Sequence, residues 1–148
     1  MKEFSLCLLL TICFSISAFC QLEPVSWNVD TEVSPEEVTI KYTATIDEGW
    51  YVYSQYLESD LGPIPTSINF DTEGIEMIGK VEEMGDKKEG YDKLFEMNIS
   101  KYSKTLTLVQ KLKRTDDLKN IKGYIEFLTC DNNRCLPPTS VDFDIKVN

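Results

Sequence analysis

Hydrophobic and polar residues alternate along several short stretches of this chain. In residues 38–46, apolar side chains occupy every second position, and threonine or lysine side chains lie between them. Residues 105–112 alternate in a similar way, with leucines separated by polar residues. Strict alternation is typical of a β-strand that buries one face and exposes the other. Both stretches are therefore predicted to be half-buried strands.

Other stretches are rich in the β-branched and aromatic residues that favour strands. They predict strands at 50–53, 67–70, 75–78, 94–99, 124–128 and 141–147. Breaks that contain glycine or proline, such as 47–49 and 62–65, separate some of them. Residues 82–93 are polar and include Gly85 and Gly90, so we expect a long mobile loop there. No stretch shows a sustained helical period.

About seven to nine short strands, spaced roughly every ten residues, predict an all-β fold. The expected architecture is an immunoglobulin-like antiparallel β-sandwich. The length of 148 residues, with 42% hydrophobic residues, suits one domain with a real core. In such a fold, chemistry belongs to the loops at the ends of the sandwich.

The amino terminus has the features of a secretory signal peptide. Lys2 supplies a positive charge, residues 6–19 are apolar, and a small-x-small pattern ends at Cys20. We therefore predict a signal peptide at 1–20 and a single domain at 21–148, exported to the periplasm or secreted. An apolar run of about 15 residues is short for a membrane anchor, which needs about 20. No later stretch is apolar enough to cross a bilayer.

A lipoprotein signal is an alternative interpretation of the same segment. In that case Cys20 would carry the lipid, although the large Phe19 before it fits such a signal poorly. The exported domain would then be tethered to a membrane instead of soluble.

The net charge of −10 argues against a nucleic-acid partner, because phosphates would be repelled and no basic patch is evident. The chain contains no histidine. That absence excludes Ser-His-Asp and Cys-His catalysis and most transition-metal sites. A P-loop and a dinucleotide-binding glycine motif are also missing. We expect no metal and no cofactor.

The remaining chemistry lies in one pair of cysteines. Three of the five cysteines fall in the predicted signal peptide, which leaves Cys130 and Cys135. Residues 131–133 are Asp-Asn-Asn, which favours a tight turn between strands 124–128 and 141–147. In an exported protein, such neighbouring cysteines are expected to form a disulfide.

This disulfide could be a structural staple or a redox-active pair. Closing a ring of about six residues contributes only about 2 kcal/mol of stability, which is little for a staple. Short, exposed disulfides are often the exchange-competent ones. The residues alone leave both interpretations open.

Two motifs resemble the amino-terminal periplasmic domain of the thiol:disulfide interchange protein DsbD. One is residues 130–138, where the cysteine pair runs into Leu-Pro-Pro, and the other is the Asp-Glu-Gly-Trp-Tyr-Val-Tyr-Ser segment at 47–54. The resemblance implies an immunoglobulin-like domain that exchanges electrons with thioredoxin-like redox proteins or a membrane thiol reductase and with oxidised periplasmic clients. It implies that Cys135 forms the mixed disulfide with partners and that Cys130 resolves it.

The same resemblance implies which residues border the cysteines. These are Tyr51, Tyr53, Leu136 and Pro137, while the predicted loop at 82–93 corresponds to a cap whose candidate lids are Met84 and Tyr91.

The chain also departs from the family pattern. The cysteine spacing is one residue shorter than in the best-known members, and Leu136 stands where an aromatic residue is expected. Without the membrane segment and thioredoxin-like domain of DsbD, the chain is expected to act as a separate carrier. Arg134 could stabilise a thiolate at Cys135 or could be an exposed turn residue.

Two other functions compete with the redox carrier. One is a non-catalytic immunoglobulin-like binding module in which the disulfide is structural. The other, a metal-binding sandwich, lacks ligands in this sequence.

Overall fold

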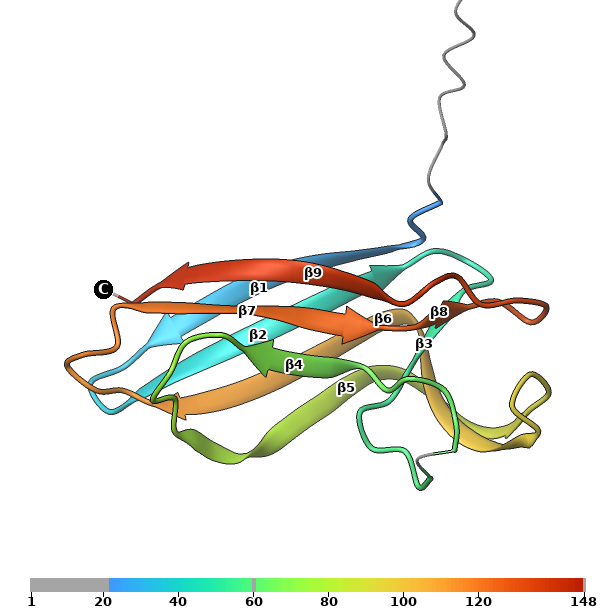
Figure 1. Cartoon of the computed structure of the whole chain (residues 1–148), viewed down its shortest axis with the longest axis horizontal. Helices are drawn as coiled ribbons and strands as arrows, with labels where there is room; N and C mark the ends of the chain where they lie inside the picture. Colours follow the sequence, from blue (N-terminus) through green and yellow to red (C-terminus); the bar gives the residue numbers. More distant parts are fainter. Residues whose placement is uncertain (1–21, 60, 148) are drawn as a thin grey trace, which may run out of the picture.

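The computed structural model describes residues 22–59 and 61–147. In this part of the chain, nine strands form two antiparallel sheets. Figure 1 shows the sheets as two stacked layers, with β8 near one end of the sandwich and the end of β9 at the other. The predicted all-β sandwich is confirmed. The predicted signal peptide and Cys20 lie outside the described residues. Within residues 22–59 and 61–147, no helix is long and apolar enough to span a membrane.

The larger sheet has six strands. Across it run, in order, β1 (Val25–Val33), β2 (Glu37–Ile46), β6 (Met97–Lys113), β3 (Tyr51–Tyr53) and β8 (Thr129–Cys130). β2 and β3 pair with successive stretches of one edge of β6, and the sixth strand, β5 (Met77–Asp92), pairs with its other edge. The smaller sheet has the order β4 (Ser67–Phe70), β7 (Asn120–Phe127) and β9 (Thr139–Lys146).

The core lies between the two sheets and follows from the alternating pattern. The inward side chains of the larger sheet include Val38, Ile40, Tyr42, Leu106, Leu108 and Leu112, and those of the smaller sheet include Ile121, Ile125 and Phe143. The ring of Tyr42 lies 5.2 Å from the ring of Phe143 across the interface. Each large apolar side chain buried in this way contributes about 1.5 to 3 kcal/mol.

The chain changes sheets immediately before the cysteines. It leaves the smaller sheet at Phe127, the end of β7, and joins the larger sheet at Thr129, the start of β8. Cys130 then pairs with Tyr51, and Thr129 pairs with Val52. This change of sheet brings the cysteine turn against the aromatic strand β3 at one end of the sandwich.

The prediction of a mobile loop at 82–93 is wrong. Nearly all of that segment belongs to β5, which pairs with β6 from Met77 to Asp92. Its side chains are polar because β5 is an edge strand whose side chains face water, and charged residues there discourage pairing with another chain. Gly85, at φ +145°, stands at one of the two irregularities in this pairing.

Two further differences concern strand boundaries. Residues 97–99 of the strand predicted at 94–99 and the strand predicted at 105–112 belong to the single strand β6, which passes through Lys104 at a positive φ of 61°, whereas residues 94–96 form a turn. The first strand, β1, was not predicted, although Val25, Trp27 and Val29 alternate with polar residues and pack against the core.

Candidate functional site

Cys130 and Cys135 form the expected disulfide across a tight turn. The backbone N–H of Asp131 donates to the carbonyl of Arg134 at 2.9 Å. The Asp131 carboxylate accepts hydrogen bonds from the backbone N–H groups of Asn133 and Arg134 at 2.7 and 2.8 Å. These two bonds hold the pKa of Asp131 below its usual value. The predicted turn chemistry is therefore confirmed.

The two cysteines differ in exposure. Cys130 is completely buried, whereas Cys135 is half-buried at the surface of the turn. Cys130 belongs to a small cluster of buried residues, separate from the main core, with Tyr51, Tyr53, Ile99 and Leu128. A partner thiol must approach along the sulfur–sulfur axis from outside, so Cys135 is the more accessible sulfur.

Both tyrosines of β3 lie at the disulfide. Their rings pack edge to face with centroids 5.6 Å apart. The hydroxyl of Tyr51 donates to the carbonyl of Asp131 at 2.8 Å, which ties β3 to the cysteine turn. Burial raises the pKa of both phenols, so both remain protonated donors at neutral pH. The structure thus places Tyr51 and Tyr53 in the same buried cluster as Cys130.

Phe95 is a residue at the site that the sequence analysis missed. It lies in the turn between β5 and β6, and its ring packs edge to face on Tyr53 with centroids 5.7 Å apart. It packs against the same buried cluster as Cys135. A large aromatic residue next to the charged segment 82–93 could have indicated a buried contact at Phe95. The prediction of a strand at 94–99 hid this signal.

The two predicted lid residues are placed differently. Tyr91 is exposed near the hairpin tip and lines a hollow with Asn132 and Asn133 of the cysteine turn. Met84 pairs with Thr107, which is five residues beyond Tyr102 on β6, where β3 pairs. That separation is roughly 17 Å along the strand. The structure therefore brings Tyr91 near the cysteine turn and leaves Met84 away from it.

A buried ion pair fixes the base of the hairpin tip. Asp92, the last residue of β5, is only 2% exposed, and its carboxylate lies 3.0 Å from the ammonium of Lys101. It also accepts the backbone N–H of Leu94 at 2.9 Å. The hydroxyls of Tyr51 and Tyr53 are each 3.5 Å away. Asp92 therefore joins the tip to the two tyrosines of the site.

Burial tends to raise the pKa of Asp92, but hydrogen bonds from Lys101 and Leu94 outweigh it and leave the pKa lowered. The ammonium of Lys101 also lies 3.8 Å from the centroid of the Tyr51 ring. That position stabilises the charge by a cation–π interaction. Asp92 thus remains a carboxylate throughout the neutral range.

Three other predicted residues flank the turn. Leu136 is half-buried, and its N–H donates to the carbonyl of Thr129 at 2.9 Å. Leu136 and Pro137 line a hollow beside the turn. Arg134 is largely exposed, with Nε 3.9 Å from the Asp131 carboxylate and its guanidinium 5.9 Å from the centroid of the Trp50 ring. Its nearest charged group is thus a carboxylate of the same turn.

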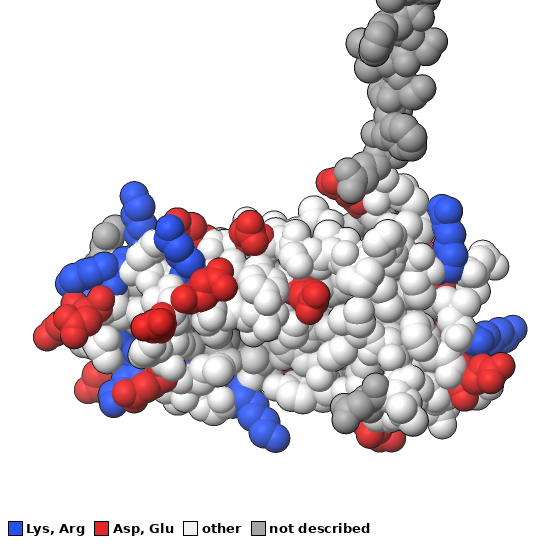
Figure 2. Space-filling view, in the orientation of Figure 1, with Lys and Arg blue, Asp and Glu red and all other residues white. Residues whose placement is uncertain are grey.

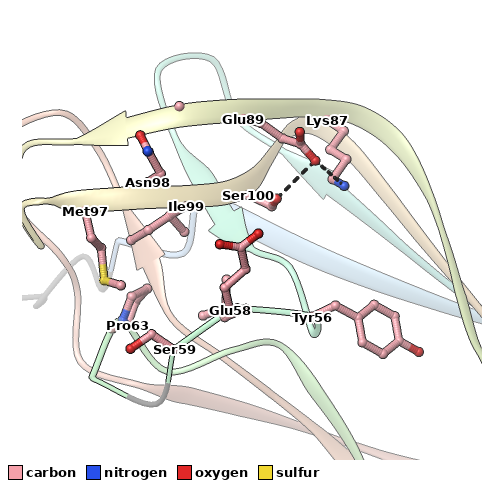
Figure 3. Close-up of a pocket in the computed structure, with 13 residues that line it drawn as sticks. Tyr56, Glu58, Ser59, Pro63, Lys87, Glu89, Met97, Asn98, Ile99 and Ser100 are labelled. Atoms are coloured by element: carbon pink, nitrogen blue, oxygen red, sulfur yellow. Dashed lines mark hydrogen bonds and ion pairs between the residues drawn. The ribbon is translucent and has the colours of Figure 1, made fainter.

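A third hollow lies on another side of the hairpin (Figure 3). It shares Met97 and Ile99 with the disulfide cluster. Glu89, at its rim, forms an ion pair with Lys87 at 2.6 Å and accepts the hydroxyl of Ser100 at 3.3 Å. The polar side chains of Lys87, Glu89 and Ser100 are therefore paired with one another. Within residues 22–59 and 61–147, no group of three or more His, Cys, Asp or Glu side chains could hold a metal ion.

Comparison with known protein families gives a match over nearly the whole described part of the chain. Residues 19–146 match the family described as thiol:disulfide interchange protein DsbD, N-terminal. The chain belongs to this family. No curated protein sequence matches the chain significantly. The DsbD family match covers both motifs on which the sequence resemblance was based.

Solved structures show that the fold is shared. The amino-terminal periplasmic domain of ScsB from Proteus mirabilis superposes with a TM-score of 0.64 at 16% identity, over 84% of this chain and 47% of that one. The chain thus spans about half the length of that structure. The reduced DsbD amino-terminal domain from Neisseria meningitidis matches with a TM-score of 0.54 at 17% identity, over 82% of this chain and 86% of that one.

A third structure is a complex between the DsbD and PilB amino-terminal domains from Neisseria meningitidis. It matches with a TM-score of 0.53 at 17% identity, over 82% of this chain and 84% of that one. At these identities the likeness establishes an immunoglobulin-like DsbD amino-terminal fold.

Proposed function

We propose that this protein is an exported thiol–disulfide exchange domain that uses Cys130 and Cys135. It takes reducing equivalents from a membrane thiol reductase or a thioredoxin-like protein and passes them to oxidised client proteins in the periplasm. The observation that carries the proposal is the unequal exposure of the disulfide, with Cys130 buried and Cys135 at the surface. Membership of the DsbD family supports the same chemistry.

The exchange has two steps. In the reduced protein, the thiolate of Cys135 attacks one sulfur of a client disulfide, forming a mixed disulfide and releasing the other client sulfur as a thiolate. The thiol of Cys130 then loses its proton and attacks the sulfur of Cys135. This step restores the Cys130–Cys135 disulfide and releases the second client sulfur. The client gains two electrons and two protons, and the domain loses the same number.

The hairpin tip between β5 and β6 would serve as the cap in this mechanism. Phe95 covers Tyr53 and packs against the cysteine cluster, while Asp92 holds the base of the tip through Lys101. A partner would have to displace Phe95 before it reached the disulfide. This arrangement would protect the pair from small thiols and disulfides.

Two observations support export to the periplasm. The related ScsB structure is described as a periplasmic domain, and residues 1–20 have the sequence of a signal peptide. The PilB complex of the DsbD domain from Neisseria supports a protein partner for this domain as well.

Single-cysteine variants test the assignment of roles. A Cys130→Ala variant retains the accessible thiol and should accumulate a mixed disulfide with a disulfide-bonded peptide, because the resolving thiol is missing. A Cys135→Ala variant should form almost none, since its remaining thiol is buried. Mass spectrometry after acid quenching measures both adducts. Equal adduct formation by the two variants would contradict the assigned roles.

The alternative is a non-catalytic binding module in which the disulfide only braces the turn. The complete burial of Cys130 is the observation that favours it. On that account, neither single-cysteine variant forms an adduct. A Cys130→Ser/Cys135→Ser double variant would then lose stability and keep its binding to protein partners.

A further inference from the structure

A groove runs along the β5–β6 hairpin and reaches the cysteine turn. It consists of two adjoining hollows, of about 710 and 430 Å³, which share Tyr51, Lys101 and Asn132. We call it the lysine groove, and its defining residues are Trp50, Tyr51, Lys88, Lys93, Lys101 and Lys104. The groove therefore gathers four lysines and the ring of Trp50 beside the cysteine turn, and one of these lysines, Lys101, is paired with Asp92.

Pairing within the fold accounts for Lys101, which binds Asp92, but not for the other three lysines. Lys88 stands directly opposite Lys101 in the β5–β6 pairing, and like charges in such positions destabilise a sheet. Lys104 is 80% exposed, and its ammonium lies 3.8 Å from the Asp86 carboxylate, a weak surface pair. Lys88 and Lys93 form no salt bridge within the described part of the chain.

Three acidic residues also line the groove, and one of them, Asp92, is already engaged. Asp92 is buried against Lys101 and the two tyrosines. Asp47 and Glu48 line the groove at the turn between β2 and β3. The whole chain carries a net charge of −10. On the face shown in Figure 2, charged side chains of both signs crowd at the end where β9 finishes, and fewer lie over the other half.

We propose that the lysine groove binds an acidic segment that flanks the reactive cysteine of a partner protein. The ammonium groups of Lys88, Lys93 and Lys104 would attract its carboxylates, and the half-buried ring of Trp50 would give apolar contact to its backbone and side chains. Disulfides flanked by acidic residues would then react faster than neutral ones. This inference rests on the proposed exchange function and adds a charge preference to it.

Two matched peptide disulfides test the preference. One is the disulfide dimer of Gly-Glu-Cys-Glu-Gly, and the other is the same dimer with glutamine in place of glutamate. The reduced protein attacks either one through Cys135, and Cys130 completes the transfer of two electrons and two protons, so each dimer yields two thiol peptides. Dithiothreitol, which has no groove, provides the intrinsic rate ratio of the two peptides.

Relative to dithiothreitol, the wild-type protein is expected to favour the acidic dimer about tenfold at low ionic strength. The preference should fall as salt is added, because exposed charges are screened. A Lys88→Glu/Lys104→Glu variant should lose the preference for the acidic dimer. The control Lys80→Glu/Lys146→Glu makes the same change in net charge at exposed positions toward the other end of the sandwich, and should keep it within about twofold.

The possible outcomes separate the two proposals. If the protein reduces both dimers with no charge preference, or favours the neutral dimer as its net charge of −10 would suggest, the groove proposal is overturned and the exchange function stands. Loss of the preference in the control variant as well would also overturn it, since overall charge would then be the cause. If neither dimer is reduced, the exchange function itself fails.

Discussion

Replacing Asp92 by asparagine is expected to lower the free energy of unfolding by about 2 kcal/mol. Breaking a buried ion pair typically costs about 3 to 5 kcal/mol, because the remaining charge is left unpaired. The expected loss here is smaller because the side chain of Lys101 is 22% exposed and can still reach water. Urea denaturation of the wild type and of Asp92→Asn at pH 7 measures the difference.

The effect should depend on pH in a defined direction. The folded-state pKa of Asp92 lies below its ordinary value of 3.8, so its carboxylate contributes stability above that pH. The contribution is lost as the pH falls through the lowered folded-state pKa, where the wild type becomes protonated. The difference in stability between wild type and Asp92→Asn should therefore be constant from about pH 5 to 8 and shrink below about pH 4.

Asp86 provides a matched control on the same strand. Its carboxylate is 37% exposed and faces the exposed Lys104 at 3.8 Å. Asp86→Asn should therefore change the stability by less than about 0.5 kcal/mol. An equal loss in both variants would show that Asp92 has no special place at the base of the hairpin tip.

Removing the Phe95 ring is expected to speed reduction of the disulfide by excess dithiothreitol about tenfold. The edge-to-face contact with Tyr53 and the burial of the ring favour the closed tip. A loss of about 1.4 kcal/mol from the closed state corresponds to a tenfold larger open population. Quenched-flow mixing of oxidised Phe95→Ala with dithiothreitol, followed by alkylation of the free thiols and mass spectrometry, measures the rate of reduction.

Leu94→Ala is the control for that experiment. Leu94 lies in the same turn but is 38% exposed and outside the cysteine cluster. Its replacement should change the rate by less than about twofold. If Phe95→Ala reacts at the wild-type rate, the hairpin tip does not cap the disulfide, whatever the role of the cysteines.

The sequence was sufficient to predict the cysteine turn, because its signal is local. Asp131 and the two asparagines that follow it specify a turn through bonds to their own backbone, which any fold would retain. The alternation in residues 38–46 predicts which side chains are buried in β2. The motif at 47–54 supplied Tyr51 and Tyr53 through resemblance to the family.

Other parts of the site depend on strand pairing that no local pattern shows. Phe95 and Asp92 reach the tyrosines only because β5 and β6 form a long hairpin whose turn lies beside β3. The polar composition of 82–93 concealed that hairpin, since an edge strand and a loop both expose polar side chains. The burial of Asp92 depends on Lys101, nine residues further along the chain.

The measurement that tests the central claim most directly is the redox midpoint of the Cys130–Cys135 pair. The purified protein would be equilibrated in buffers with a graded ratio of thiol to disulfide. The oxidised fraction would then be measured by alkylation of the free thiols and mass spectrometry. A protein that exchanges disulfides with partners should have a midpoint between roughly −180 and −270 mV, the range of known exchange proteins. A midpoint below about −300 mV would mark an inert structural bridge and would contradict the proposed function.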